Sequence, residues 1–178
     1  MKVILLAVSS VDGRLTRWDE SNIYAWTSKE DTNHFFDTIK ENKLIVMGSK
    51  TFDVVKPRPE KERLRIVLTR TPEKYSSFAL AGSLEFMHET PDILVARMEK
   101  LGYTQMILVG GSTLATSFFR KDLIDELWLT LEPRVFGNGL PLVEKTTFDI
   151  SLRLMHVKQL NIQGTLLLKY SVRKKKFL

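Results

Sequence analysis

The sequence contains no cysteine, which excludes disulfide bonds, zinc–thiolate sites and iron–sulfur clusters. It also lacks any apolar run close to the ~20 residues that are needed to cross a bilayer. The apolar segment at its start, Met1 to Val8, is too short for a signal peptide. Its three histidines show no metal-ligand spacing. We therefore expect a cytoplasmic protein that binds neither a membrane nor a metal ion.

The amino-acid composition is that of an ordinary globular protein with an excess of positive charge. Of its 178 residues, 43% are hydrophobic and 27% are charged, and the formal net charge is +6. This length suits one domain covering residues 1–178. The positive charge favours anionic ligands. Because no basic stripe carries interleaved surface aromatics, we do not expect nucleic-acid binding, and the basic run 173–176 is expected to be a solvated tail.

The most informative stretch joins a buried strand to a glycine turn and a helix. The apolar run 106–109 leads into Gly110 and Gly111, and a segment with helical periodicity follows Ser112. We expect the glycines to allow unusual dihedral angles and the close approach of a ligand, and Ser112 to be the helix N-cap. A strand, a glycine turn and a helix N-terminus form a typical phosphate site. A plain tight turn capped by serine is the alternative.

Two other predicted strands end in similar residues. The strand 43–48 ends at Gly48 and is followed by Ser49, Lys50 and Thr51, and the strand 65–70 ends in Thr69 and Arg70. Because ligands bind beyond the carboxyl ends of parallel strands, these residues are expected along one rim of the sheet. Three polar or cationic strand ends on one rim favour a phosphate-rich cofactor over a simple turn.

Strands and helices alternate along most of the chain. We predict a mostly parallel, doubly wound α/β sheet with antiparallel C-terminal strands at one edge. The predicted strands are 2–9, 43–48, 65–70, 84–88, 106–109, 125–132, 152–160 and 166–172. The predicted helices are 28–41, 90–101 and the segment after Ser112.

One carboxylate lies at the edge of an expected buried helix face. Residues 28–31 match a capping box, and the helix that follows should bury Phe35, Phe36 and Ile39. At ~100° per residue, Asp31 falls at the margin of that face and is therefore partly buried. It either caps the helix or has a functional role. The preceding loop carries Trp18, Tyr24 and Trp26, which either close over a ligand or cover one end of the core.

Five motifs follow one another along the chain: Ser-x-Asp-Gly at 10–13, Trp-Thr-Ser at 26–28, Met-Gly-Ser-Lys-Thr-Phe at 47–52, Val-Gly-Gly-Ser-Thr-Leu at 109–114 and Gly-Asn-Gly-Leu-Pro-Leu at 137–142. In this order they resemble the dihydrofolate reductase superfamily, and the resemblance covers residues 3 to about 170. The closest likeness is to the reductase domain of riboflavin biosynthesis (the C-terminal domain of the bifunctional deaminase-reductase) and its stand-alone relatives. It implies a dihydrofolate-reductase-like three-layer sandwich.

The resemblance implies NADPH as the hydride donor. Residues matching the nicotinamide half are Ala7, Val8 and Leu15. Residues matching the adenosine phosphates and their surroundings are Gly48, Ser49, Lys50, Thr51, Leu68, Thr69 and Arg70. Residues matching the pyrophosphate cradle are Val109, Gly110, Gly111, Ser112, Thr113 and Leu114. Members of this family often carry a non-proline cis peptide between the two glycines, which would mark a functional turn if present.

The resemblance further implies a substrate site around Asp31. Asp31 matches the carboxylate that binds and polarises a heterocycle, Thr130 matches the threonine that supports it, and Asp12, Trp26 and Phe35 match neighbouring substrate positions. The Asp12-Gly13 pair and the loop 137–142 are closer to the riboflavin branch than to dihydrofolate reductase. The implied activity is NADPH-dependent reduction of a pyrimidine riboside like 5-amino-6-(5-phosphoribosylamino)uracil. A dihydrofolate reductase and an inactive NADPH-binding protein are the alternatives. A homodimer formed through the C-terminal strands, with Leu166 to Val172 as the edge, is implied as well.

Overall fold

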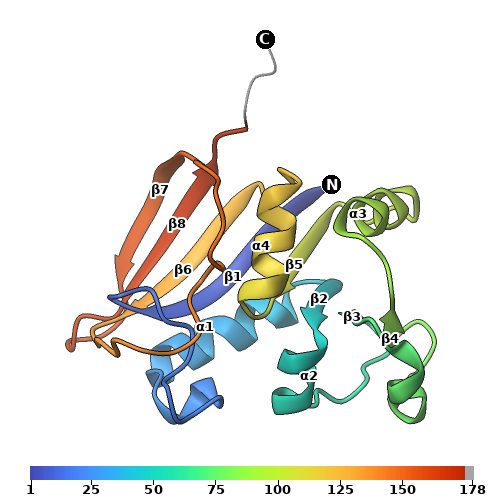
Figure 1. Ribbon diagram of the computed structural model, residues 1–178, viewed down its shortest axis with the longest axis horizontal. Helices are drawn as coiled ribbons and strands as arrows, with labels where there is room; N and C mark the ends of the chain where they lie inside the picture. The colour runs from blue at the N-terminus through green and yellow to red at the C-terminus, as the bar shows by residue number, and fades with distance from the viewer. Residues whose placement is uncertain (175–178) are drawn as a thin grey trace.

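The computed structural model describes residues 1–174 and is built on one eight-stranded sheet (Figure 1). In spatial order the strands are β4 (Leu84–Met87), β3 (Leu64–Leu68), β2 (Leu44–Gly48), β5 (Gln105–Val109), β1 (Lys2–Ser10), β6 (Glu126–Glu132), β8 (Leu166–Val172) and β7 (Leu152–Gln159). The first six are mutually parallel, β8 runs antiparallel to β6, and β7 runs antiparallel to β8. The predicted fold class is confirmed. The basic run predicted at 173–176 falls partly outside the described residues.

Helices cover both faces of the parallel strands. α1 (Lys29–Lys40) and α2 (Ser49–Val55) pack on one face, and α3 (Pro91–Lys100) and α4 (Ser112–Arg120) pack on the other. Two 3-10 helices, Ile23–Ala25 and Pro72–Phe78, lie in the connections. None of the helices within residues 1–174 is long and apolar enough to span a membrane.

The apolar runs are continuous because the parallel strands are buried on both faces. In β1, Val3 and Leu5 join the core under α3 and α4, whereas Ile4 and Leu6 join the core under α1 and α2. Each such side chain, buried to within a few per cent, contributes about 2 kcal/mol to folding. This packing holds the strand ends, and hence the rim of the sheet, in fixed positions.

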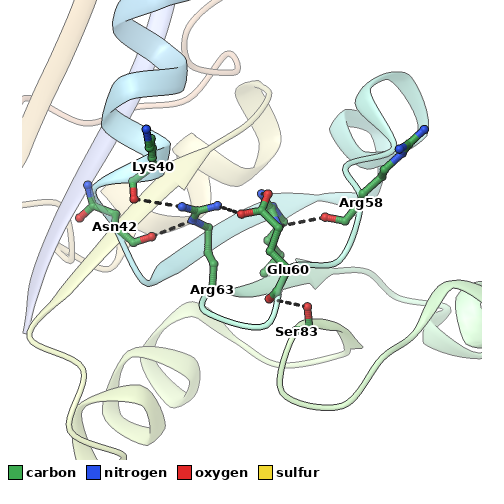
Figure 2. A network of polar contacts seen from close by, with 7 residues as sticks. Lys40, Asn42, Arg58, Glu60, Arg63 and Ser83 are labelled. Carbon is green, nitrogen blue, oxygen red and sulfur yellow. Dashed lines mark hydrogen bonds and ion pairs between the residues drawn. The ribbon is translucent and has the colours of Figure 1, made fainter.

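The carboxyl end of α1 is anchored by a buried arginine (Figure 2). The Arg63 guanidinium donates to the carbonyl oxygens of Asn42 at 2.9 Å and Lys40 at 3.0 Å, and it pairs with Glu60. These carbonyls belong to the turn in which a helix has no internal donors. Arg63 therefore satisfies the end of α1 and ties it to the start of β3. The other members of the network are Arg58, Arg65 and Ser83.

The amino end of α1 confirms one prediction and corrects another. Ser28 is the N-cap, and its Oγ accepts a hydrogen bond from the Asp31 N–H at 3.2 Å. Phe36, predicted in the buried stripe, is 53% exposed and stacks on Tyr24 with ring centroids 6.0 Å apart. The buried face of α1 runs through Asp31, Thr38 and Ile39, so it is rotated away from Phe36.

The C-terminal edge of the sheet also differs from expectation. β8, predicted as the edge strand, is paired on both sides by β6 and β7, so β7 forms the edge. Every residue of β7 is exposed. A strand with both faces and one edge open is unusual within a single folded chain.

Candidate functional site

The site lies where the direction of the chain connections reverses along the sheet. β2 and β5 are hydrogen-bonded neighbours, but β2 connects through α2 to β3 on one side, and β5 connects through α4 to β6 on the other. In open α/β sheets, the loops diverge beyond such a pair of strands, and a ligand crevice is expected at their carboxyl ends. Gly48 and Gly110 are the residues at this point.

The two glycine turns approach each other closely. A Cβ atom on Gly110 would lie 3.2 Å from Leu114 Cδ2, 3.5 Å from the Gly48 nitrogen and 3.6 Å from Thr51 Oγ1. The glycine turn after β5 therefore packs closely against the start of α2, with little free space for a side chain at Gly110. The prediction of unusual dihedral angles is wrong, because neither Gly110 nor Gly111 has a positive φ. A cis peptide between the two glycines is also absent, since no peptide bond within residues 1–174 is cis.

The start of α4 is organised differently from the prediction. Its N-cap is Gly111, and Ser112 is already the first helical residue. The buried Ser112 hydroxyl donates to the Pro141 carbonyl oxygen, and the Thr113 hydroxyl donates to the Glu144 carboxylate. Because these hydroxyls have protein partners, an anion at this turn would be bound by the main-chain N–H groups of the first turn of α4.

The cationic strand ends lie beside this crevice. Gly48 is paired with Leu68 across β2 and β3, so the residues that follow these two strands are neighbours. Lys50 lies in the first turn of α2 and Arg70 lies two residues beyond β3, and both are exposed. Neither forms an ion pair within the described part of the chain. Ser49, Thr51 and Thr69 complete this side of the rim. The structure thus places the predicted phosphate-binding residues together.

Asp31 lies further along the same rim, over β6. Its side chain is only 6% exposed, although it is a carboxylate. The pKa of Asp31 is raised to about 6: burial is the main cause of the rise, a hydrogen bond with Thr130 opposes it, and the charge of Glu132 adds to it. The cap of α1 is provided by the Ser28 hydroxyl, so the carboxylate of Asp31 is not needed for capping. This arrangement supports the functional interpretation of Asp31.

One strand separates Asp31 from the glycine crevice. β1 lies between β6 and β5, and Val8 of β1 is paired with Thr130 of β6. With neighbouring strands about 4.8 Å apart, β6 and β5 are separated by about 10 Å. The carboxyl-terminal half of β1, which carries Ala7 and Val8, therefore lies between the predicted phosphate site and the buried carboxylate of Asp31. This spacing suits two ring systems held side by side.

Buried polar atoms without a partner gather around the start of α1. Within the described residues they are Tyr24 OH, Trp26 Nε1, Thr27 Oγ1 and His34 Nε2. A buried polar group left unpaired costs roughly 1–3 kcal/mol, so such a concentration is expected where a ligand or water supplies the missing hydrogen bonds. Beside two of these atoms, those of Tyr24 and Thr27, is a shallow, open cavity of about 460 Å³ that is lined by Tyr24, Thr27, Lys29, Thr32 and Phe36.

The aromatic loop contributes both to the core and to the cavity. Trp26 is 2% exposed and packs edge-on against Phe136 at 4.9 Å, so it closes one end of the core. Tyr24 lines the cavity, and its pKa is raised by burial and by the charge of Asp31. Trp18 is 61% exposed and covers neither. Phe35 is half-buried on α1, one turn beyond Asp31.

Asp12 fastens two loops to each other. Its carboxylate accepts hydrogen bonds from Ser10 Oγ at 2.7 Å, Phe136 N at 3.0 Å and Gly137 N at 2.8 Å. These hydrogen bonds, chiefly the one from Ser10, lower the pKa of Asp12 to about 2. The buried Leu15 continues this contact, because its N–H donates to Leu140 O at 2.7 Å. The structure gives Asp12 a role in holding the loop, and its binding of a substrate stays a prediction.

Sequence reasoning did not identify Glu132. This residue is 3% exposed, lies on the same face of β6 as Thr130 and contributes to the charge around Asp31. Alternation along the strand places residues 128, 130 and 132 on one face, and that pattern could have drawn attention to it. No group of three acidic or histidine side chains within residues 1–174 could hold a metal ion.

Comparisons with known proteins agree with this geometry. A family model described as the RibD C-terminal domain matches residues 1–166. The chain is 27% identical over 165 residues to "Uncharacterized protein YwjB" of Bacillus subtilis, covering 89% of this chain and 91% of that protein. A putative riboflavin biosynthesis protein from Shewanella sp. PV-4 has the same fold, with a TM-score of 0.79, 19% identity and coverage of 97% and 99% of the two chains.

A second solved structure is that of a longer protein, of which this chain matches only a part. It is the diaminohydroxyphosphoribosylaminopyrimidine deaminase/5-amino-6-(5-phosphoribosylamino)uracil reductase of Thermotoga maritima, with a TM-score of 0.74 and 14% identity. The match covers 96% of this chain and 56% of that protein. At these identities, the two solved structures establish a common fold. They confirm the architecture expected from the sequence motifs.

Proposed function

Because the chain belongs to the RibD C-terminal domain family, whose fold is that of a riboflavin-pathway reductase domain, we propose that it is an NADPH-dependent reductase of a pyrimidine riboside. The observation that carries this proposal is the buried Asp31 carboxyl, with a pKa of about 6, on the same rim as a glycine crevice with free cationic side chains. The cytoplasm is the proposed place of action, and the lack of cysteine fits it.

The residues at the rim fit a dinucleotide phosphate. The main-chain N–H groups at the start of α4 would bind the pyrophosphate, and Gly110 allows the backbone to come close. Lys50 and Arg70 would pair with the 2′-phosphate, since both are exposed cations without a partner in the described chain. Ala7 and Val8 would lie along the nicotinamide. When bound, NADPH would supply the hydride.

Asp31 would hold and transfer the proton that the substrate ring requires. A carboxyl group with a pKa of about 6 can both hold and release a proton near neutral pH, which is the property required of a general acid. Next to a heterocycle, it would hydrogen-bond to a ring nitrogen and favour the protonated ring, which accepts a hydride more readily. Thr130 would keep the carboxyl group oriented. The half-buried Phe35, one turn further along α1, would pack against the ring.

We expect the double variant Lys50→Ala/Arg70→Ala to bind NADPH more weakly by a factor of about 100 or more and NADH almost normally. Hydrogen bonds to a charged group contribute about 1.5–3 kcal/mol each, and only NADPH carries the 2′-phosphate. The measurement is a fluorescence titration with both cofactors. As a control, Lys43→Ala/Arg58→Ala removes two exposed cations from other parts of the surface and should change neither affinity. Equal weakening of both cofactors would show that these side chains do not select NADPH.

Turnover tests the remainder of the proposal. NADPH oxidation is followed with 5-amino-6-(5-phosphoribosylamino)uracil, related pyrimidine ribosides and dihydrofolate as acceptors. We expect turnover with the pyrimidine ribosides. Turnover of dihydrofolate alone would instead assign a dihydrofolate reductase. NADPH binding without oxidation by any acceptor would assign an inactive NADPH-binding protein.

We also propose that the protein is a homodimer and expect light scattering to give twice the chain mass of 20.5 kDa. β7 forms the open edge of the sheet, and Leu154, Met155 and Val157 are each about half exposed. A second copy of the strand would cover this edge and its apolar side chains. Val157→Lys should give a monomer, whereas Ile162→Lys, in the turn after β7, should remain dimeric. A wild-type monomer at micromolar concentration would exclude the dimer.

A further inference from the structure

Glu132 is a buried carboxylate at the carboxyl end of β6. Its Oε1 accepts a hydrogen bond from the Ser28 N–H at 2.7 Å, and its Oε2 accepts one from Thr165 Oγ1 at 2.8 Å. Thr165 is fully buried, and Glu132 is 3% exposed. A buried carboxylate is costly unless donors surround it, and removing its partners would leave an uncompensated charge. Both carboxylate oxygens of Glu132 therefore have donors within the fold.

The hydrogen bonds around Glu132 form a closed path that returns to α1. Thr165 Oγ1 also accepts from Asn161 Nδ2 at 2.9 Å, and Asn161 Oδ1 accepts from the Thr165 N–H at 3.0 Å. Asn161 Nδ2 in turn lies 3.1 Å from Glu30 Oε2, in the first turn of α1. The turn between β7 and β8 thus supports the start of α1 through Glu132 and Glu30.

The same contacts lead directly to Asp31. Glu132 holds the main chain of Ser28, and the Ser28 hydroxyl holds the Asp31 N–H at 3.2 Å. Thr130, which hydrogen-bonds with Asp31, lies two residues before Glu132 on the same face of β6. Arg63 anchors the opposite end of α1 (Figure 2), so Glu132 is the matching anchor at the end that carries Asp31.

We infer that Glu132 is a positioning residue for the proposed reaction: it seats the first turn of α1 on β6 and so fixes the Asp31 carboxyl group against Thr130. The charge of Glu132 is also one cause of the raised pKa of Asp31. This inference rests on the proposed function for its catalytic consequence, but the effect on Asp31 exists without turnover. Glu132 itself does not touch the substrate, because both of its oxygens are occupied by Ser28 and Thr165.

The pKa of Asp31 depends on the groups that face its carboxyl group. They are Tyr24 from the 3-10 helix before α1, and Thr130 and Glu132 from β6. Among them, Glu132 is the group whose charge raises the pKa of Asp31. Glu132→Gln keeps the size and one acceptor while removing the charge, so Asp31 should release its proton at lower pH. Glu132→Leu removes both acceptors and should release the start of α1 from the sheet.

The experiment follows the Asp31 carboxyl group by carbon NMR as a function of pH in the wild type and in Glu132→Gln. We expect the midpoint to move to lower pH in Glu132→Gln. The control Glu126→Gln removes a carboxylate at the other end of the same strand, where it accepts from Lys2 and Trp128, and should leave the midpoint unchanged. An unchanged midpoint in Glu132→Gln would overturn the inference. Because this measurement needs no substrate, it stands even if the proposed reductase activity fails.

Measurements of turnover and of helix mobility distinguish the positioning role of Glu132 from the effect of its charge. Glu132→Leu should lower kcat about 10-fold or more with unchanged NADPH affinity, and Glu132→Gln should recover most of this loss. If either variant does not fold, Thr165→Val removes one donor to Glu132 within a similar volume. It should speed amide hydrogen exchange at the start of α1 and leave the end held by Arg63 protected. Exchange that rises equally at both ends, or at neither, would contradict the role of Glu132 as the local anchor.

Discussion

Asp31→Asn should lower turnover by a factor of about 100 or more while making the folded protein more stable above pH 6. The loss of turnover is expected because asparagine cannot transfer a proton to the substrate ring. For a substrate that is protonated before it binds, the loss should become smaller at low pH. NADPH affinity should not change, since Asp31 is separated from the phosphate rim by β1.

The gain in stability follows from the raised pKa. In the folded protein Asp31 has a pKa of about 6, against 3.8 in the unfolded chain, so the folded state binds the proton more tightly. Stability is therefore lost as the pH rises from about 4 to about 6, and the loss is complete above that range. A shift of about 2 units at 1.36 kcal/mol per unit gives an upper limit of about 3 kcal/mol. Asp31→Asn should recover part of this amount at pH 8 and almost none at pH 4.

Urea unfolding at pH 4 and pH 8, together with turnover and NADPH titration, checks this prediction. Asp37→Asn, an exposed position on the same helix, is the matched control and should change none of the three. If Asp31→Asn kept full turnover, Asp31 would have no part in the chemistry and the proposed mechanism would fall with it. A loss of stability at pH 8 would show that the buried carboxylate is a net stabilising group.

Gly139→Ala should destabilise the protein by about 3 kcal/mol or more and weaken NADPH binding. A Cβ atom at Gly139 would lie 1.9 Å from the Thr16 carbonyl oxygen, a main-chain atom that cannot rotate away. The φ of +138° adds strain for any side chain. The loop would have to separate from residues 15–16, breaking the bonds of Leu140 to Leu15 and Thr16. Because Pro141 O holds the Ser112 hydroxyl, the start of α4 would move as well.

Gly82→Ala is the control for Gly139. Gly82 also has a positive φ, +74°, but a Cβ atom there would meet nothing within 4 Å. The cost should be about 1 kcal/mol, from backbone strain alone. Chemical unfolding of both variants and an NADPH titration give the comparison. Equal losses of stability would mean that the overlap with Thr16 is relieved by small loop shifts.

Much of the architecture could be predicted from local patterns. Continuous apolar runs such as 44–47 and 106–109 indicated strands buried on both faces, and alternation with helices indicated their parallel pairing. Such runs are informative because burial on both faces leaves no polar positions in the strand. The cap at Ser28 could also be read locally, because a cap bond joins residues three apart.

The remaining features depend on pairs of residues that are distant in the chain. Gly139 meets Thr16, Gly110 meets Gly48, and the Ser112 hydroxyl is taken up by Pro141 rather than by its own helix. The exposure of Phe36 and the position of β7 at the edge were likewise decided by how α1 and β8 pack. The spacing of residues within one segment gives no information about contacts between distant segments.

Asp31 shows most clearly where the two kinds of information separate. Residue type, helix period and motif order determined that a carboxylate would stand at the margin of the buried face of α1, near a rim with glycines and cations. Only the tertiary structure decided how strongly it holds a proton, because that depends on the burial of Asp31 between α1 and the sheet, on Thr130 and on the charge of Glu132, 101 positions along the chain. A pKa is set by the dielectric and the charges around a group in space, and neighbours in sequence do not define that surrounding.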